Sequence, residues 1–493
     1  MFRNSVFMTA MGMTAVVVVW GMVDTLSLAM FANDTVSVLL KSRGWFVMLT
    51  VSFLLFSCCG LAFSRYGGIR LGRDDDRPEF ATFTWLNMMF AAGMGVGLLF
   101  YGVAEPTLHY EFISKFTKPN VAMGQALSLT IFHWGLHAWA IYGVGGLVIA
   151  YFGFRLGRPK TMSAPIYTIF GRGPVARVTG WWVDVMALYA IAIGLSGSIA
   201  MGVFQVKSGL MRLLGIQDAG MALSLGIFAC LVIAYILPLL RDLGEGMAML
   251  SNLAMAVTVG LIVYVLLFGP TAFLMGTVTE TLGQYLGGVI PQGFVNFTFW
   301  GDSVREWFTD WTLNYMVWWL AWAPFVGVFL ARISKGRTIR EYILGVLLVP
   351  TGFSVLWFGV MGGLGAYQSY HGHYDHTVAS TDINAATFAL LETLPLHQVT
   401  IVATILAAFL FIVTSVVSAA FVLAMFTAGG DENPPTRLKV AWGVILGVLG
   451  LVMIITDSVD AVRAIIALSA NPFVFIITLM MVCLFVALKA EKE

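Results

Sequence analysis

Twelve long apolar stretches constrain this chain more than any other feature of its sequence. A helix needs about 20 predominantly apolar residues to cross a bilayer. Stretches of this kind lie at 4–24, 43–64, 83–103, 123–152, 176–204, 218–239, 247–269, 311–331, 341–366, 398–427, 438–456 and 469–488. Only 11% of the 493 residues are charged, against about 25% in soluble domains. The sequence therefore predicts an all-α polytopic membrane protein with twelve transmembrane helices.

The positive charges indicate on which side of the membrane the termini lie. Most of the 27 Lys and Arg residues belong to the termini and to alternate loops, with clusters at 65–77 and 332–340. Because cytoplasmic loops carry the excess of Lys and Arg, both termini are predicted to be cytoplasmic. The net charge is only +1, which leaves no basic surplus for a phosphate backbone and argues against nucleic acid as a partner.

Glycine and proline interrupt the third and the eighth stretch at matching places. The sequence AAGMGVGLLFYG occupies 91–102 and WWLAWAPFVGVFLARIS occupies 318–334, and each opens a run of five stretches. Interrupted helices at corresponding positions of two halves indicate an inverted-repeat transporter with its site near the midplane. The predicted organisation comprises two N-terminal transmembrane helices at 1–82, a first inverted repeat at 83–270 (spans 3–7), an amphipathic interfacial helix region at 271–310, a second inverted repeat at 311–488 (spans 8–12) and a short cytoplasmic tail at 489–493.

Three glycines in five residues, Gly93, Gly95 and Gly97, mark the third stretch. Gly93 and Gly97 form a GxxxG pair, which lets two membrane helices approach closely. Glycines also lower helix stability by about 1 kcal/mol each, which permits an unwound turn whose amides and carbonyls face a ligand. Close packing and an unwound turn are compatible with each other, so the sequence leaves both interpretations open.

Two groups of aromatic side chains lie in the middle of spans four and eight. The first group consists of Trp134, Trp139 and Tyr142, and the second of Trp318, Trp319 and Trp322. On a helix of 3.6 residues per turn, the first group falls within an arc of about 140° and the second within about 100°. Packing or interfacial anchoring accounts for most single aromatic residues, but both groups lie away from the headgroup region. With no carboxylate on either group, two converging indole faces suit a quaternary ammonium ion, at up to about 2 kcal/mol per desolvated contact.

Span ten contains adjacent hydroxyl groups at Thr414 and Ser415. Such hydroxyls usually donate to the carbonyl four residues earlier in their own helix. The alternative is a sodium site, in which two hydroxyls act together with carbonyls of an unwound turn at 91–94, because hard cations take several oxygen ligands. Two acids near span ends, Glu105 and Asp184, are predicted to form pairs or helix caps.

Three sequence motifs resemble those of the betaine–choline–carnitine transporter family. They are GMGVGLLFYGVAEP at 93–106, FHWGLHAWAIYG at 132–143 and WWLAWAPFVGVFLARISKGRTIRE at 318–341, continued by GVLLVP at 345–350. The similarity extends over nearly the whole chain. It implies a LeuT-type core of two inverted five-helix repeats preceded by two extra helices, in a homotrimer surrounded by lipid in the bacterial inner membrane.

The resemblance also implies roles for the aromatic and glycine residues. It implies that Trp134, Trp139, Tyr142 and Trp319 form an aromatic box. It also implies that Trp318 and Trp322 line the substrate pathway. Proton-coupled choline transporters of the family carry an acid where this chain has Gly97. The glycine favours a zwitterion whose carboxylate meets the backbone at Met94, Gly95 and Gly97.

The resemblance further implies one sodium site. The ligands of this site in sodium-coupled betaine symporters are retained, namely the hydroxyls of Thr414 and Ser415 and the carbonyls of Ala91, Met94 and Phe411. A second site of those symporters is expected to be lost, because Ile191 and Leu195 stand where the family has threonines.

We therefore expect a sodium-coupled secondary transporter that imports a betaine-type zwitterion and uses no organic cofactor. Glycine betaine, carnitine and related quaternary ammonium or dimethylsulfonium compounds are the expected substrates. The alternative within the same family is a sodium-independent betaine or carnitine exchanger. An enzyme is not expected, because the spans contain no paired carboxylates, metal-ligand set or nucleophile–base pair.

Overall fold

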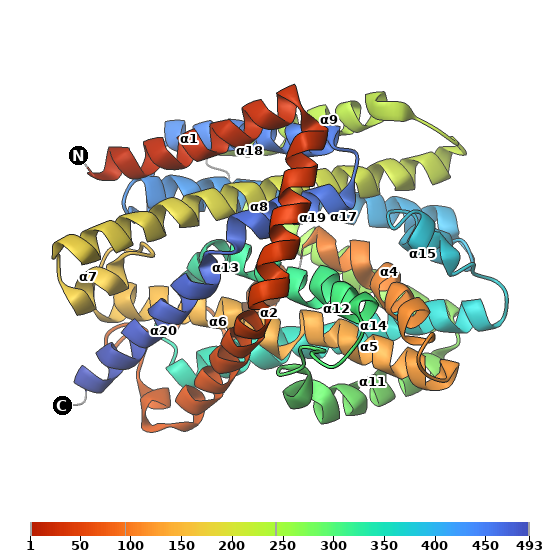
Figure 1. Ribbon diagram of the computed structural model, residues 1–493, viewed down its shortest axis with the longest axis horizontal. Coiled ribbons are helices and arrows are strands. Elements are labelled where there is room, and N and C mark those ends of the chain that lie inside the picture. The colour runs from red at the N-terminus through yellow and green to blue at the C-terminus, as the bar shows by residue number, and fades with distance from the viewer. Residues whose placement is uncertain (1, 94, 242–243, 492–493) are drawn as a thin grey trace.

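The computed structural model describes residues 2–93, 95–241 and 244–491, and its regular elements are helices (Figure 1). They are α1 (Phe2–Val23), α2 (Thr25–Phe63), η1 (Arg65–Gly68), α3 (Thr82–Gly93), α4 (Val96–Ile113), α5 (Pro119–Trp134), α6 (Leu136–Ala150), η2 (Tyr151–Arg155), α7 (Ala164–Phe170), α8 (Pro174–Leu214), α9 (Gly220–Arg241), α10 (Gly244–Phe268), α11 (Thr271–Gln292), α12 (Asp302–Phe308), η3 (Thr309–Leu313), α13 (Asn314–Ile333), α14 (Ile339–Tyr370), α15 (Thr377–Thr381), α16 (Ala386–Leu391), α17 (His397–Thr427), α18 (Thr436–Ile455), α19 (Val459–Ala470) and α20 (Phe473–Ala490). Within these residues, β pairing is confined to one isolated bridge between Arg70 and Thr338. The predicted all-helical fold is confirmed.

Eleven helical stretches of the described residues are long and apolar enough to cross a membrane. They correspond to eleven of the twelve predicted spans, and the exception is the third, at 83–103. There α3 ends at Gly93 and α4 begins at Val96, with Gly95 extended between them (φ −110°, ψ −154°). No continuous helix of spanning length therefore covers this window. The twelve predicted spans correspond to eleven helical stretches and one discontinuous pair, α3–α4, which is broken where the glycines predicted an unwound turn.

A second break divides the predicted fourth span between α5 and α6. Gly135 lies at this break, and a β-carbon on it would be 2.5 Å from both the Ile131 carbonyl oxygen and the Tyr285 hydroxyl. A residue without a side chain is therefore required. The backbone N–H of Leu136, which begins the new helix, donates to the Tyr285 hydroxyl at 2.8 Å. The break leaves Trp134 at the C-terminal end of α5.

The region 271–310, predicted to contain an amphipathic interfacial helix, holds α11 and α12. Helix α11 packs against α5 and α14. Its buried residues are spaced seven and then four apart, as on one face of a helix, and they are Leu274, Thr281, Tyr285 and Val289. One face of α11 is therefore packed against the protein. The elements α12, η3 and α13 then form one helical stretch, Asp302–Ile333, so the helix that contains the eighth predicted span begins before residue 311.

The 41-residue helix α8 lies at the centre of the helical packing and contacts α13, α17, α18 and α19. Helix α13 also packs against α6. The 39-residue helix α2 crosses the other long helices at a steep angle (Figure 1). The broken helix α3–α4 therefore meets a framework of long, continuous helices.

Helix α19 lies between the predicted spans at 438–456 and 469–488. Ser458 caps its N-terminus by accepting a hydrogen bond from the N–H of Ala461 at 3.2 Å. Its buried residues include Arg463. Because α19 packs against α8 and α13, it places a cationic side chain in the interior of the protein.

Candidate functional site

A small cavity of about 60 Å³ lies beside the break between α3 and α4. The lining residues come from the break and from α4, α5, α6, α8, α13 and α17: Gly95, Val96, Gly97, Trp134, Tyr142, Leu195, Ser198, Ile199, Met201, Tyr315, Trp318, Trp319, Trp322, Ile412, Ser415 and Val416. None of these described lining residues carries a charge. The cavity therefore offers a ligand aromatic faces, aliphatic side chains, hydroxyl groups and backbone groups.

The four rings of the predicted aromatic box lie together in the structure. Trp319 is at their centre, with centroid distances of 5.6 Å to Trp134, 4.7 Å to Tyr142 and 6.1 Å to Trp139. Trp134 and Trp319 meet edge to face, with their planes at 84°. Three of these rings line the cavity, while Trp139 is fully buried behind Tyr142 and Trp319. Residues from α5, α6 and α13 thus build one aromatic cluster.

The two outer tryptophans of α13, Trp318 and Trp322, also line the cavity. The Trp318 ring contacts Tyr101 and Tyr315, at centroid distances of 6.2 Å and 5.9 Å. The buried Nε1 of Trp322 has no hydrogen-bond partner among the described residues. A β-carbon on Gly194 of α8 would lie 3.2 Å from this nitrogen.

The glycines at the break have different surroundings. A β-carbon on Gly97 would lie 3.0 Å from Cη2 of Trp134, whereas one on Gly95 would lie 3.9 Å from its nearest neighbour, the Ser415 hydroxyl. Gly97 therefore allows the α4 backbone to approach the indole closely, and Gly95 borders open space. Met94, the other predicted backbone contact, lies outside the described residues.

The predicted sodium ligands are only partly placed by the structure. The Thr414 hydroxyl lies 3.0 Å from the Leu410 carbonyl oxygen and 3.1 Å from that of Phe411, to which it donates within α17. A hydroxyl that donates still has oxygen lone pairs for a cation, so this contact is compatible with both interpretations of Thr414. Ser415 lines the cavity. Met94 lies outside the described residues, and the surroundings of Ala91 are not described.

A buried carboxylate lies directly behind the aromatic cluster. Glu105 of α4 accepts hydrogen bonds on Oε2 from Trp134 Nε1 at 2.8 Å and from the Tyr315 hydroxyl at 2.6 Å. The prediction that the aromatic groups have no carboxylate nearby is therefore wrong. The prediction considered only residues on spans four and eight, whereas Glu105 lies on α4. The other acid, Asp184, accepts from the backbone N–H and the hydroxyl of Ser163.

Two histidines complete the surroundings of Glu105. Oε1 lies 2.7 Å from His133 Nδ1 and 3.3 Å from His109 Nε2. His133 Nε2 lies 2.9 Å from the Thr312 hydroxyl. The acid and both histidines are fully buried and lie close enough to one another to hold a metal ion. Direct hydrogen bonds join these atoms into a polar network behind the cavity, in which the buried Nδ1 of His109 has no partner among the described residues.

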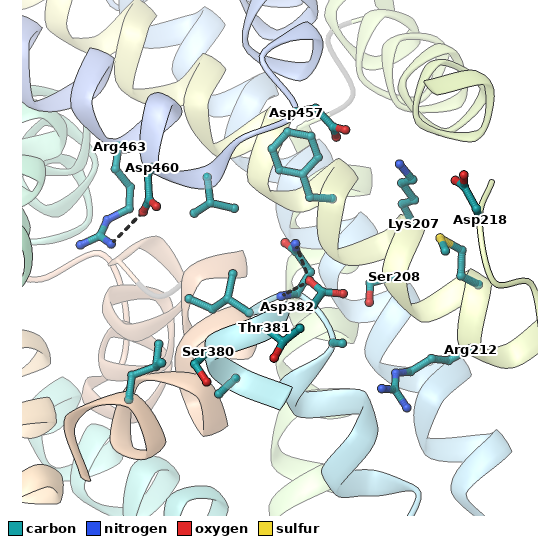
Figure 2. Close-up of a pocket in the computed structure, with 18 of the residues that line it drawn as sticks. Lys207, Ser208, Arg212, Asp218, Ser380, Thr381, Asp382, Asp457, Asp460 and Arg463 are labelled. Carbon is teal, nitrogen blue, oxygen red and sulfur yellow. Dashed lines mark hydrogen bonds and ion pairs between the residues drawn. The ribbon is translucent and has the colours of Figure 1, made fainter. Parts of the chain in front are cut away.

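A second, larger cavity of about 1250 Å³ is lined by polar and charged side chains (Figure 2). Lys207 and Arg212 come from α8, Ser380 from α15 and Asp460 from α19. Asp460 forms an ion pair with Arg463 at 3.7 Å, which Figure 2 marks with a dashed line. A zwitterion or a hydrated ion has charged and polar partners in this space.

A layer of side chains separates the two cavities. Trp311 lines the larger cavity and Tyr315 the smaller one. Their rings stack at a centroid distance of 6.1 Å. The guanidinium group of Arg463 lies 4.7 Å from the Trp311 centroid and 5.9 Å from the Tyr315 centroid. Trp311, Tyr315 and Arg463 thus lie in contact with one another between the linings of the two cavities.

The fold and the cavities define a multi-pass membrane transporter, in which a buried site lies at a break in a helix. The sequence profile described as BCCT, betaine/carnitine/choline family transporter, matches residues 5–493. The chain belongs to this family. It is therefore a transporter and not an enzyme.

Individual relatives match over most of the chain. The glycine betaine transporter OpuD of Bacillus subtilis (strain 168) is 36% identical over 495 residues, which cover 99% of this chain and 95% of that protein. A probable glycine betaine transporter of Desulfitobacterium hafniense (strain Y51) is 35% identical, with 98% and 96% covered. The high-affinity choline transport protein of Escherichia coli (strain K12) is 34% identical, with 94% and 68% covered.

Proposed function

We propose that this transporter imports a betaine-type zwitterion in symport with sodium, by alternating access. Glycine betaine, carnitine or a related methylammonium or dimethylsulfonium compound is the proposed substrate. The observation that carries the proposal is the uncharged cavity at the Gly95 break, whose walls include the rings of Trp134, Tyr142 and Trp319. Aromatic faces attract a cation, and they do so without requiring the cation to donate hydrogen bonds.

The size of the cavity supports a methylated headgroup. One water molecule needs about 10–15 Å³ of such space, so a cavity of about 60 Å³ holds roughly four to six water-sized groups. A trimethylammonium group with its adjoining carbon is of this size. Trp139 is proposed to support the box from behind, and Trp318 and Trp322 to line the pathway.

The helix break supports the placement of the substrate carboxylate. Helix α4 begins at Val96, and the first N–H groups of a helix have no partner within the helix. The helix dipole adds a partial positive charge at the same end. We place the carboxylate at the backbone of Met94, Gly95 and Gly97.

The layer between the two cavities supports alternating access. Trp311, Tyr315 and Arg463 separate the aromatic site from the large polar cavity. We propose that they form the closed outer barrier, and that the large cavity is the entrance from outside the cell. Opening requires Trp311 and Tyr315 to separate from the guanidinium group.

The organisation expected from the family forms part of the proposal. Two LeuT-type inverted repeats at 83–270 and 311–488 follow the two helices at 1–82, and α11 lies at the membrane interface within 271–310. The discontinuous pair α3–α4 is the third span in chain order, and with it the number of spans is twelve. The protein is proposed to be a homotrimer in the bacterial inner membrane, with both termini and the tail at 489–493 in the cytoplasm.

Sodium is the proposed coupling ion, and no organic cofactor is required. The proposed ligands are the hydroxyls of Thr414 and Ser415 and the carbonyls of Ala91, Met94 and Phe411. Ser415 supports this set because it lines the cavity at the break, so that ion and substrate would share one site. Sodium-independent exchange of betaines remains the alternative function.

Uptake into proteoliposomes tests the proposal. Purified protein is reconstituted, and uptake of radiolabelled glycine betaine, carnitine and choline is compared with and without an inward sodium gradient. Symport predicts concentrative uptake only with sodium. Full activity without sodium that depends on preloaded substrate would establish the exchanger instead. A flux that neither saturates nor responds to sodium would contradict both.

A further inference from the structure

The carboxylate of Glu105 lies directly behind two walls of the aromatic cavity. Its Oε2 accepts hydrogen bonds from Trp134 Nε1 at 2.8 Å and from the Tyr315 hydroxyl at 2.6 Å. Both rings line the cavity, whereas Glu105 is fully buried behind them. We propose that Glu105 is a positioning residue that fixes Trp134 and makes its ring face more negative, so that the site selects a methylated cation over a neutral group of the same shape.

The donors around Glu105 are consistent with an ionised carboxylate. An indole N–H can only donate, so Oε2 acts as the acceptor from Trp134. On the other side, the Thr312 hydroxyl lies 2.9 Å from His133 Nε2, and His133 Nδ1 lies 2.7 Å from Oε1. If Thr312 donates to Nε2, then Nδ1 of a neutral His133 carries the proton and donates to Oε1. One assignment of protons therefore satisfies the chain Thr312–His133–Glu105–Trp134.

The same contacts fix the position of Trp134. Glu105 holds the Nε1 side of the indole, and at the far edge Cη2 faces Gly97, where a β-carbon would lie only 3.0 Å away. The edge-to-face contact with Trp319 restrains the ring from a third direction. Turning the indole would leave a buried carboxylate without one of its donors, which is costly. The cavity wall is therefore pre-organised for its ligand.

The carboxylate also acts on the charge of the ring. A cation is attracted by the negative face of an aromatic ring. A hydrogen bond from the indole N–H to an anion is strong and moves electron density from the N–H into the ring. The charge of Glu105 further attracts the same cation directly, through an interior of low dielectric constant. Both effects favour a cation, and neither favours a neutral tert-butyl group.

This inference rests on the proposed function, because it requires that the cavity bind a methylated cation. The ligand 3,3-dimethylbutanoate allows the inference and the proposed function to be tested separately. It has the shape and the carboxylate of glycine betaine, but a carbon atom replaces the quaternary nitrogen. The ratio of the dissociation constants for these two ligands measures how strongly the site selects the positive charge.

The test compares this ratio in wild-type protein and in two Glu-to-Gln variants. Dissociation constants of the purified full-length protein are measured by isothermal titration calorimetry. Glu105→Gln keeps the size of the side chain and removes its charge. We expect it to weaken glycine betaine binding by about fivefold or more and to change 3,3-dimethylbutanoate binding by less than about twofold.

Glu111→Gln is the matched control, because Glu111 lies on the same helix, is half-buried and does not line the cavity. It should change neither constant.

A second comparison covers the case in which Glu105→Gln does not fold. Trp134→Phe and Trp319→Phe both remove an indole from the cavity wall, but only Trp134 is hydrogen-bonded to Glu105. Trp134→Phe should therefore lose more selectivity than Trp319→Phe. Where Glu105→Gln does fold, the double variant Glu105→Gln, Trp134→Phe should lose little more than Trp134→Phe alone, since the two residues act through one bond.

Three results would overturn the inference. One is an equal loss of affinity for both ligands in Glu105→Gln, which indicates a purely structural role. Another is unchanged selectivity in that variant, and the third is an equal effect of the two Trp-to-Phe changes. A wild-type protein that binds both ligands equally well would instead contradict the proposed function, and the inference would fail with it.

Discussion

The rings of Trp134 and Trp319 meet edge to face, with centroids 5.6 Å apart and planes at 84°. Trp134 belongs to the first of the two proposed repeats and Trp319 to the second. The wall of the cavity is therefore shared between the two halves of the chain. In the proposed transport cycle, a movement of one half relative to the other would change this contact, so substrate binding and alternating access would depend on the same pair of residues.

Replacing Trp319 by leucine should weaken substrate binding strongly. Trp319→Leu keeps an apolar side chain at the centre of the box but removes the negative ring face, so affinity should fall by about 1–3 kcal/mol, which is about tenfold or more. Titration of purified protein with glycine betaine measures the change. Trp182→Leu serves as the control, because Trp182 is exposed on α8 and does not line the cavity. Equal affinities of the wild type and Trp319→Leu would mean that this tryptophan has only a packing role.

Alanine substitutions at the two glycines of the break should have different effects. A β-carbon at Gly97 would press on Trp134, which Glu105 and Trp319 hold in place, whereas a β-carbon at Gly95 meets nothing closer than 3.9 Å. Overpacking of this kind typically costs at least about 1 kcal/mol, so Gly97→Ala should weaken glycine betaine binding about fivefold or more. Gly95→Ala should leave Trp134 undisturbed, so its tryptophan fluorescence without ligand should match that of the wild type, whereas Gly97→Ala should shift the spectrum. Spectra of the two ligand-free variants and the titration of Gly97→Ala measure these effects, and a shift in Gly95→Ala alone would contradict this account of the break.

The sequence predicted the parts of the site that follow from the periodicity of single helices. The glycines at 93–97 predicted the break, and the arcs on spans four and eight predicted which rings gather around Trp319. Glu105 was not recognised as a partner of Trp134, because an arc describes one helix and Glu105 reaches the indole from another. The contact depends on how α4 packs against α5, and the periodicity of a single helix does not predict how two helices pack.

The C-terminal part of the fold shows a second limit of the sequence. The windows of about 20 apolar residues end at 456 and resume at 469, so they predict no helix over most of α19. This helix has only 12 residues and includes Asp460 and Arg463, so no apolar window can detect it. Its Ser458 cap is a signal that could have found it. Missing α19 also meant missing the guanidinium group that lies against Trp311 and Tyr315.

Cysteine labelling should reveal the proposed orientation in the membrane. Ser380 lines the large polar cavity and is exposed, whereas Gly173 lies in the loop 153–175, which we place in the cytoplasm. In a protein without its four native cysteines, Ser380→Cys should react with a membrane-impermeant maleimide in intact cells. Gly173→Cys should react only after permeabilisation, and the space around Gly173 accommodates a side chain without strain. Labelling in the reverse pattern would contradict cytoplasmic termini.

The sodium dependence of uptake should have a Hill coefficient near one. The positions where the family's second sodium site requires hydroxyls are Ile191 and Leu195, and both are fully buried apolar residues. A sodium ion without ligands in such surroundings is too costly to bind. Initial rates in proteoliposomes, measured over a range of sodium concentrations at saturating glycine betaine, give the coefficient. Clear sigmoidal dependence would require a second ion site elsewhere.

The hydroxyls of α17 allow the remaining sodium site to be tested. The double variant Thr414→Ala, Ser415→Ala removes the two proposed side-chain ligands and should lose sodium stimulation of uptake while remaining folded. Thr404→Ala is the matched control, because the Thr404 hydroxyl donates to the Thr400 carbonyl oxygen of the same helix at 2.8 Å and does not line the cavity. It should keep the sodium response of the wild type. An intact response in the double variant would remove Thr414 and Ser415 from the site, since a hard cation cannot lose two oxygen ligands without a large loss of affinity. If the double variant exchanges substrate at full rate without sodium, sodium-independent exchange becomes the better description of the transport cycle.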